Sequence, residues 1–401
     1  ETARVEQQAR TILSAPVQFS FQERLFSLSP EAVAASLRVR VVDDPESPGK
    51  DDSLSLQVDP DALREKVVQA APFTYAAPRN ATFAVVGGEV RLNASSDGST
   101  VDTEPAALQI RNLGQTRTPI PLSAKPLPAE FTTEMARGLG IARKISTFTT
   151  FFDSQNAPRV ANIDRMAQAI DGKVLRPGDS FSLNSATGPR TPENGYQEAQ
   201  VIVDGELVPG IGGGVCQVAT TLFNSIFNAG LEVLERSNHS LHISKYPIGR
   251  DATVSFGQQD LRFRNDTEYG ILLKTSVSAK AMTVDVYSSP LGRVVEAVAS
   301  EPRNPKAPAT KFVDDPALPA GQEAVSEEGK PGFDITVTRK VTKDGKVIHS
   351  DTFVSKYKAW KKIVRRGTGP PAPPAPAPAV PAPAPPGVTP APAAPPPGPG
   401  G

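Results

Sequence analysis

The sequence predicts a multidomain α+β protein in which a cysteine-bearing helix packs on a mostly antiparallel sheet, with α+β and β-rich domains on either side. Three observations support this fold class. The chain has 401 residues, which suits two to four domains. An amphipathic stretch from Val215 to Gly230 has the apolar spacing of one helix. Short alternating apolar runs joined by turn residues flank this stretch on both sides and indicate antiparallel hairpins.

Three glycines, Gly212 to Gly214, precede the predicted helix and indicate a loop whose backbone approaches another group closely. Cys216, the only cysteine of the chain, falls in the first turn at the edge of the apolar stripe, beside Phe223 and Phe227. A sulfur in this position is half-shielded, and the helix dipole favours its thiolate form. The alternative interpretation is that Cys216 is a small buried hydrophobe, as free cysteines usually are.

The predicted helix has no capping side chain at its start, because Gly214 occupies the N-cap position. Its first backbone N–H groups are therefore predicted to be free for an anion or a developing oxyanion. We assign this role to the backbone of four residues: Gly213, Gly214, Cys216 and Gln217.

Two of the three histidines follow the helix closely in the sequence. A strand from Leu231 to His239 would be long enough to return antiparallel to the helix and bring His239 beside Cys216. His239 and His242 differ by an odd number, so on a regular strand only one of them faces the thiol. The predicted pair consists of a nucleophile, Cys216, and its general base, His239. Asp251 is the first candidate to orient the base, and its alternative role is to cap a turn.

Strands and turns complete the predicted central domain. A helix is predicted from Arg159 to Ile170, and Asp204-Gly205 marks a hairpin turn. After the histidines, alternation and β-branched residues predict three strands. They are Ala252–Phe256, Ile271–Thr275 and Met282–Val286.

A longer pattern contains these residues. It consists of Pro177–Asn184, Gly188–Thr191, Gly212–Asn224, Glu235-Arg236, His239-Ser240, Gly249–Val254 and Asp260–Asn265. This pattern, within residues 148 to 288, resembles the VanW domain of bacterial cell-envelope proteins, a family named after vancomycin-resistance clusters. The resemblance implies an extracytoplasmic location in the envelope. Because some members are described as L,D-transpeptidases, it also implies that the cysteine attacks a peptidoglycan stem peptide.

Four residues are candidates to bind that peptide. Arg236 and Arg250 have the charge to bind carboxylates of the stem peptide. Ser240 and Arg190 match positions of the family pattern and complete the predicted substrate-binding group. The alternative for the arginines is structural pairing or solvation.

The sequence divides into four parts. Residues 1–137 are predicted to form an α+β domain, with helices starting at Ser29-Pro30 and Asp59-Pro60 and a hairpin at Gly87-Gly88. This part loosely resembles the peptidoglycan-binding region often found ahead of VanW domains, and its alternative is a structural spacer.

Residues 138–290 are the VanW-like domain. Residues 291–368 are β-rich, with a hairpin at Asp344-Gly345, and weakly resemble the wall-associated module named for its five glycines. We assign no site residue to this part, and residues 369–401 are predicted to form a disordered Pro/Ala/Gly-rich tail.

Composition excludes several other functions. The 43 basic and 43 acidic residues balance without a basic block, which argues against nucleic acid as a partner. No apolar window is long enough for a membrane span, and the start at Glu1 is interpreted as removal of an upstream signal or anchor. Val215 stands where a phosphate loop needs lysine and a dinucleotide loop its third glycine. One cysteine and two diverging histidines do not suit zinc, so no cofactor or metal is expected.

Two functions from different classes remain. The first is a cell-wall-modifying cysteine acyltransferase that resembles L,D-transpeptidases and cross-links stem peptides through Cys216 and His239. The second is a non-catalytic peptidoglycan-binding or scaffolding protein in which Cys216 only packs. We favour the first, and the sequence leaves the oligomeric state open.

Overall fold

The computed structural model describes residues 2–42, 53–114, 117–203 and 206–370. These residues form two compact units. One contains the described residues up to Pro305 together with Phe333–Lys358, and the other contains Lys306–Gly332 and the described residues from Ala359 onward. The turn Asp204-Gly205 and the predicted tail from position 371 lie outside the described residues. Among the helices described, none combines the length and apolarity that a membrane crossing requires.

The N-terminal part of the first unit contains short helices and small sheets. Ser29 and Asp59 cap the helices α2 and α3 with their side-chain oxygens, and each helix has proline at its first position. Gly87 and Gly88 adopt positive φ angles of 62° and 87° in the two-residue turn between β5 and β6. The elements of this part are α1 (Thr2–Ile12), β1 (Val17–Phe21), β2 (Arg24–Leu28), α2 (Pro30–Ala34), β3 (Leu37–Val42), β4 (Ser53–Val58), α3 (Pro60–Ala70), β5 (Thr82–Val86), β6 (Glu89–Asn93), β7 (Gly98–Asp102), α4 (Glu104–Arg111), β8 (Ile120–Pro121), β9 (Ser123–Leu127) and α5 (Thr133–Gly138).

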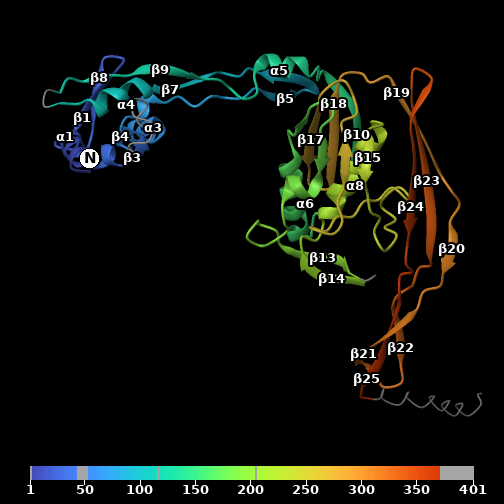
Figure 1. Ribbon diagram of the computed structural model, residues 1–401. Helices are drawn as coiled ribbons and strands as arrows, with labels where there is room; N and C mark the ends of the chain where they lie inside the picture. Colours follow the sequence, from blue (N-terminus) through green and yellow to red (C-terminus); the bar gives the residue numbers. More distant parts are fainter. Residues whose placement is uncertain (1, 43–52, 115–116, 204–205, 371–401) are drawn as a thin grey trace, which may run out of the picture. The chain divides into compact units, whose positions relative to one another are not determined.

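The central part of the first unit is a layer of helices on an antiparallel sheet of order β10-β18-β17-β11. Helix α8 lies against β10 and β18, and α6 lies against β17 and α8 (Figure 1). The elements are β10 (Arg143–Phe151), α6 (Ala157–Ile170), β11 (Val174–Leu175), β12 (Ser180–Ser182), α7 (Leu183–Thr187), β13 (Glu198–Val203), β14 (Glu206–Ile211), α8 (Val215–Asn228), β15 (Glu232–Glu235), β16 (Arg262–Arg264), β17 (Ile271–Val277) and β18 (Ala281–Ser288).

Helix α8 is the centre of this core, because all its residues except Cys216 and Asn228 are buried. Its apolar face joins the largest hydrophobic cluster. Its buried polar side chains are all hydrogen-bonded: Thr221, for example, lies 2.7 Å from the Thr150 hydroxyl of β10, and Ser225 donates to the Val284 carbonyl of β18 at 2.8 Å. A helix buried on every side leaves few routes to solvent, and the first turn at Cys216 is one of them.

A long hairpin that follows the central part completes the covering of α8. The hairpin consists of β23 (Gly332–Lys343) and β24 (Lys346–Lys356), and β23 also pairs with β19 (Arg293–Ala299) and β20 (Arg303–Lys306). Phe353 packs its ring 5.5 Å from that of Phe223 and 5.7 Å from that of Phe227. The fully buried Arg339 donates to the carbonyls of Phe227 and Leu231 at the end of α8. The hairpin therefore belongs to the same hydrophobic core as the helix.

The second unit is a small sheet of order β21-β25-β22. Strands β21 and β25 are parallel, whereas β22 and β25 are antiparallel. Its strands are β21 (Thr310–Pro319), β22 (Glu323–Glu327) and β25 (Lys362–Gly369). The overall architecture is consistent with a multidomain α+β chain built mostly of small antiparallel sheets.

The predicted strand Ala252–Phe256 is wrong. In the structure this segment makes only isolated bridges, Thr253 with Ser237 and Ser255 with Gln259. The reason is that its backbone groups are taken by side chains of α8. Both the N–H and the carbonyl of Ala252 pair with the Thr220 hydroxyl at 3.0 Å, so they cannot join a ladder.

Candidate functional site

The glycine loop sets the start of α8 by close packing against the protein itself. A Cβ atom at Gly213 would lie 2.6 Å from backbone atoms of Ala199 and Gln200, and the Gly213 carbonyl accepts from buried Asn162 at 3.0 Å. Gly214, at the N-cap position, has a φ of 111° and no capping side chain. The glycine loop therefore approaches strand β13 and the side chain of Asn162 closely.

Cys216 lies on a stripe of α8 that follows an extended segment of the chain. The side chains of Cys216, Thr220 and Asn224 contact, in order, the carbonyls of Val254, Ala252 and Arg250 at 3.7, 3.0 and 2.8 Å. The match is geometric, because four helical residues advance about 6 Å and two extended residues advance about 6.5 Å. This register also places the Thr253 hydroxyl 3.3 Å from the Cys216 sulfur.

His239 and Asp251 lie near Cys216, and the three residues are called the triad below. The charge of His239 acts on the thiol, whose geometric contacts are the Thr253 hydroxyl and the Val254 carbonyl. Nδ1 of His239 lies 2.7 Å from Oδ2 of Asp251, so Nε2 is the nitrogen left for the sulfur. The predicted strand does not carry His239, because β15 ends at Glu235. Instead, the His239 backbone N–H donates to Asp251 Oδ2 at 2.7 Å and fixes the loop.

The ionisation of the pair follows from these contacts. Burial raises the pKa of the Cys216 thiol, but the hydrogen bond and charge of His239, together with Thr253 and the Val254 carbonyl, outweigh burial and lower this pKa to about 7. Burial lowers the pKa of His239, whereas its hydrogen bonds to Asp251 and Cys216 raise this pKa to about 9. Between these values the favoured state is a thiolate beside an imidazolium.

Asp251 is a buried carboxylate held by donors on both oxygens. Arg236 donates to Oδ1 at 3.0 Å, and the Tyr357 hydroxyl donates to the same oxygen at 2.6 Å. Burial raises the pKa of Asp251, but His239, Arg236 and Tyr357 outweigh it, so this pKa lies below its ordinary value. The carboxylate is therefore ionised and fixed in the orientation that presents Oδ2 to His239.

Sequence reasoning missed Tyr357 because no site residue was assigned after position 290. Tyr357 directly follows β24, and Ser355 of the same strand accepts from Arg236 at 3.0 Å. Tyr246, whose ring stacks at 6.1 Å on that of His239, was missed as well. The only sequence signal for these residues was their aromatic character near a polar cluster, which is also typical of core packing.

The oxyanion group predicted from the sequence is only partly available. The Gln217 N–H donates to the Gly214 carbonyl at 2.9 Å, and the Gln217 side chain, which is buried, bonds Thr150, the Phe151 carbonyl and Arg159. Gln217 therefore has a structural position. The backbone N–H groups of Gly213, Gly214 and Cys216 remain candidates to stabilise a developing oxyanion.

The predicted substrate-binding residues separate into two groups. The Arg236 side chain is 2% exposed and is fully engaged with Asp251, Ser355 and the Gly249 carbonyl, so it positions the triad. Arg250 donates to Asn228 at 2.6 Å and packs 4.0 Å above Phe227. Because Asn228 is twelve residues after Cys216 on α8, this site is about 18 Å along the helix from the thiol. Neither arginine suits the predicted role.

The other two predicted residues lie closer to the surface of the site. Ser240 contributes its backbone carbonyl, which accepts from the Lys358 N–H at 2.7 Å. Arg190 donates Nη1 to Asn184 at 2.7 Å and to the Gly188 carbonyl at 3.0 Å. Burial lowers the pKa of Arg190, whereas the charges of Tyr196, Cys216 and Asp260 raise it.

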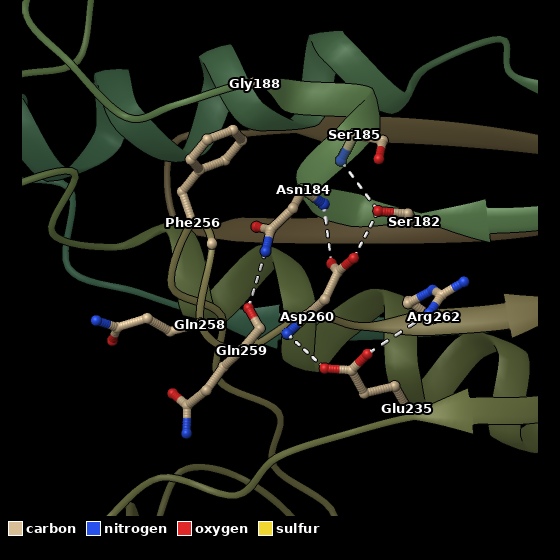
Figure 2. Close-up of a pocket in the computed structure, with 11 residues that line it drawn as sticks. Ser182, Asn184, Ser185, Gly188, Glu235, Phe256, Gln258, Gln259, Asp260 and Arg262 are labelled. Carbon is tan, nitrogen blue, oxygen red and sulfur yellow. Dashed lines mark hydrogen bonds and ion pairs between the residues drawn. The ribbon is translucent and has the colours of Figure 1, made fainter.

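A cavity of about 560 Å³ lies beside this arginine. Figure 2 shows its lining, where Asn184 donates to the carbonyl of Gln259 and Asp260 accepts from Ser182 and from the Asn184 backbone. The lining residue Phe256 lies two positions after Val254, which, like Thr253, contacts the Cys216 sulfur. Among the described residues, no cluster of three or more His, Cys, Asp and Glu side chains is arranged to hold a metal ion.

Comparison with protein families identifies three regions. Residues 158–287, which contain the triad residues Cys216, His239 and Asp251, match the family described as "VanW like protein". The central part of the chain therefore contains a VanW-like domain. Residues 8–116 match the family described as "Putative peptidoglycan binding domain", and residues 300–369 match the G5 domain. The VanW-like match ends before Tyr357, which lies within the G5 match.

Two curated relatives resemble parts of this VanW-domain protein. The uncharacterized protein YoaR of Bacillus subtilis (strain 168) is 42% identical over 147 residues, which are 37% of this chain and 48% of the relative. The vancomycin B-type resistance protein VanW of Enterococcus faecalis (strain ATCC 700802 / V583) is 30% identical over 115 residues, 27% of this chain and 42% of the relative. The chain therefore spans about half the length of the curated relatives it matches.

Two solved structures are similar to a part of this chain. The crystal structure of HP0197-G5 is 22% identical and covers 19% of this chain and 95% of that structure, with a TM-score of 0.11. The G5 domain structure of IgA1 protease is 19% identical and covers 19% of this chain and 88% of that structure, with a TM-score of 0.14.

Proposed function

We propose that this VanW-domain protein binds peptidoglycan at the bacterial cell envelope. The proposal is supported by the peptidoglycan-binding match at residues 8–116 and the G5 match at residues 300–369, which flank the VanW-like domain. Of the two functions predicted from the sequence, the comparisons favour this non-catalytic one. Their descriptions name binding and resistance, and neither curated relative is described by a transpeptidase activity.

A second candidate function, thiol acyl transfer on stem peptides, is favoured by one specific observation. The 2.7 Å contact between His239 Nδ1 and Asp251 Oδ2 orients an imidazole whose other nitrogen is left for the Cys216 thiol. A cysteine that only fills space needs no base, and a histidine that is not a base needs no buried carboxylate to orient it. The partial exposure of Cys216 on an otherwise buried helix gives a substrate access to the sulfur.

The proposed chemistry uses only these groups. The Cys216 thiolate attacks the carbonyl carbon of a peptide amide, and the Cys216 N–H stabilises the oxyanion that forms. The His239 imidazolium then gives its proton to the leaving amine, and a thioester remains on Cys216. An acceptor amine attacks the thioester, neutral His239 takes the proton of that amine, and the thiolate leaves. The products are a new amide and the original enzyme.

One experiment separates the two functions. Purified peptidoglycan is incubated with the wild-type protein and with Cys216→Ala, the protein bound to sedimented wall is measured, and the released muropeptides are analysed by mass. A binding protein sediments equally in both forms and leaves the muropeptide masses unchanged. An acyltransferase produces shortened or newly cross-linked muropeptides in the wild type alone. Failure of both proteins to sediment with the wall would contradict the binding proposal.

A further inference from the structure

Arg190 carries a guanidinium that the protein engages on one side only. Its Nη1 has two acceptors, Asn184 and the Gly188 carbonyl. Its Nε and Nη2 are buried and have no hydrogen-bond partner among the described residues. By contrast, the buried arginine Arg236 uses Nε, Nη1 and Nη2 for hydrogen bonds. Arg190 therefore has two buried donors whose hydrogen bonds the described residues leave unmade.

The free edge has a chemical preference. Nε and Nη2 lie on the same edge of the planar guanidinium, and this edge binds the two oxygens of a carboxylate in a bidentate manner. Arginine stays charged in proteins, so leaving these buried donors without an acceptor is unfavourable until an anion arrives. The position thus favours a ligand with a carboxylate.

The guanidinium lies between the glycine loop and the cavity. A Cβ atom at Gly212 would lie 3.2 Å from Cβ of Arg190, which places the arginine stem against the loop that leads into Cys216. On the other side, Asn184, Gly188 and Phe256 all line the cavity, with the Phe256 ring 6.0 Å from the guanidinium carbon (Figure 2). Phe256 is half exposed on a short turn, so displacing its ring would admit a ligand to the buried edge.

We propose that Arg190 binds the carboxylate of a peptide that has an amide bond beside Cys216. Arg190 would thereby select peptides with a free carboxylic acid near that amide, whether the amide is cleaved or only bound. The inference rests on the proposed presence of a wall peptide at this site. Asp260 and Glu235 line the same cavity and disfavour a doubly charged phosphate, so a carboxylate with a single charge fits better.

The first test compares two alkylating reagents of similar size, one negatively charged and one neutral. Iodoacetate carries a carboxylate, and iodoacetamide does not. The ratio of their rates with Cys216 is measured at pH 7.5 in the wild-type protein, in Arg190→Gln and in Arg165→Gln. Arg165, 5.8 Å from the ring of Tyr196, is a matched control because its charge, like that of Arg190, acts on Tyr196. We expect the ratio to fall roughly fivefold in Arg190→Gln and to stay unchanged in Arg165→Gln. An equal ratio in all three proteins would overturn the proposal.

The second test does not depend on thiol chemistry. The Cys216→Ala protein and its Arg190→Gln derivative are titrated with N-acetyl-L-lysyl-D-alanine and with the C-terminal amide of the same dipeptide. We expect the first protein to prefer the free acid by roughly tenfold and the derivative to lose this preference. If the thiol is inert to both reagents but the preference for the free acid depends on Arg190, acyl transfer is contradicted and the carboxylate site stands. Equal binding of acid and amide by the Cys216→Ala protein would overturn the carboxylate site itself.

Discussion

The Tyr357 hydroxyl lies 2.6 Å from Oδ1 of Asp251, although the two residues are 106 positions apart and both side chains are buried. The contact ties the end of β24 to the residue that orients His239. The carboxylate that contacts His239 is thus held partly by a segment outside the VanW-like match.

Tyr357→Phe removes the hydroxyl and keeps the ring, which packs against His242 and Phe333. We expect the free energy of unfolding to fall by about 1–2 kcal/mol, because a buried carboxylate oxygen loses one donor. Chemical denaturation measures the change. Tyr75→Phe, at an exposed tyrosine, is the control and should remain within about 0.5 kcal/mol of the wild type. Equal stability of Tyr357→Phe and Tyr75→Phe would show that the Tyr357 hydroxyl does not contribute to the free energy of unfolding.

The pH dependence of alkylation reports on the Cys–His pair. For the wild type, the rate with iodoacetamide should rise through an inflection near pH 7, where the thiol ionises beside the imidazolium. In His239→Ala the burial remains while the positive charge is lost, so the inflection should move upward by about two pH units. The thiolate–imidazolium pair persists in the wild type until His239 loses its proton near pH 9.

His242→Asn is the control for that measurement. Its ring lies against Phe333 and Tyr357 and is not among the groups that act on the thiol, so the inflection should stay near pH 7. An inflection that is the same in His239→Ala as in the wild type would assign Cys216 to packing alone.

Gly213→Ala tests the close packing of the loop. The added Cβ would lie 2.6 Å from the backbone of Ala199 and Gln200, which cannot move aside without shifting β13. We expect a loss of about 2 kcal/mol or more in unfolding free energy, and slower alkylation because the first turn of α8 is displaced. Gly138→Ala, where a Cβ meets nothing within 4 Å, is the control in thermal unfolding. A loss no larger than that of the control would mean that the loop adapts easily.

Asp266 gives a stability test with a defined sign. Burial raises the pKa of Asp266, but Arg293 and His349 outweigh it, so this pKa is lowered in the folded protein. The stabilisation is therefore present above the unfolded value and is lost as the pH falls through the folded one. Asp266→Asn should cost about 3 kcal/mol at pH 7, because Arg293, 7% exposed, loses its partner.

The difference in unfolding free energy between Asp266→Asn and the wild type should begin to shrink below about pH 4, where the unfolded wild type takes up a proton. It should be smallest below the folded pKa of Asp266, where neither folded protein carries the charge. Urea denaturation at several pH values measures it. Glu268→Gln is the control, because its ion pair with Lys343 is at the surface and contributes little. A cost that stays constant from pH 7 to pH 3 would contradict the assigned ion pair.

Local signals in the sequence predicted much of the fold. The caps at Ser29 and Asp59 and the hairpin turns at Gly87-Gly88 and Asp344-Gly345 are present as predicted, because each depends only on neighbouring residues. The strand predicted at Ala252–Phe256 is wrong because its structure depends on residues that are distant in the sequence. Its alternation is that of a strand, but its hydrogen bonds go to side chains of α8, which no pattern within the segment can indicate.

The site was predictable to a similar degree. The proximity of Cys216, His239 and Asp251 follows from the reach of the chain between them. The roles of Arg236 and Tyr357 do not, because both depend on a hairpin that enters from beyond residue 330. Charge alone could not separate Arg236, which is enclosed, from Arg190, which keeps an open edge. That distinction depends on the three-dimensional surroundings of the two arginines.

The hairpin β23–β24 also constrains how such proteins can be recombined. The boundary that family comparison draws after residue 287 passes through a shared interior, in which Phe353 packs edge to face against Phe223 and Arg339 donates to a carbonyl at the end of α8. A gene fusion that joined this VanW-like segment to a different C-terminal module would inherit a helix with an uncovered aromatic face. It would also inherit an aspartate that lacks the Tyr357 donor. A recombined protein would therefore keep this site only if both modules were transferred, or if the new module supplied contacts equivalent to those of Phe353, Arg339 and Tyr357.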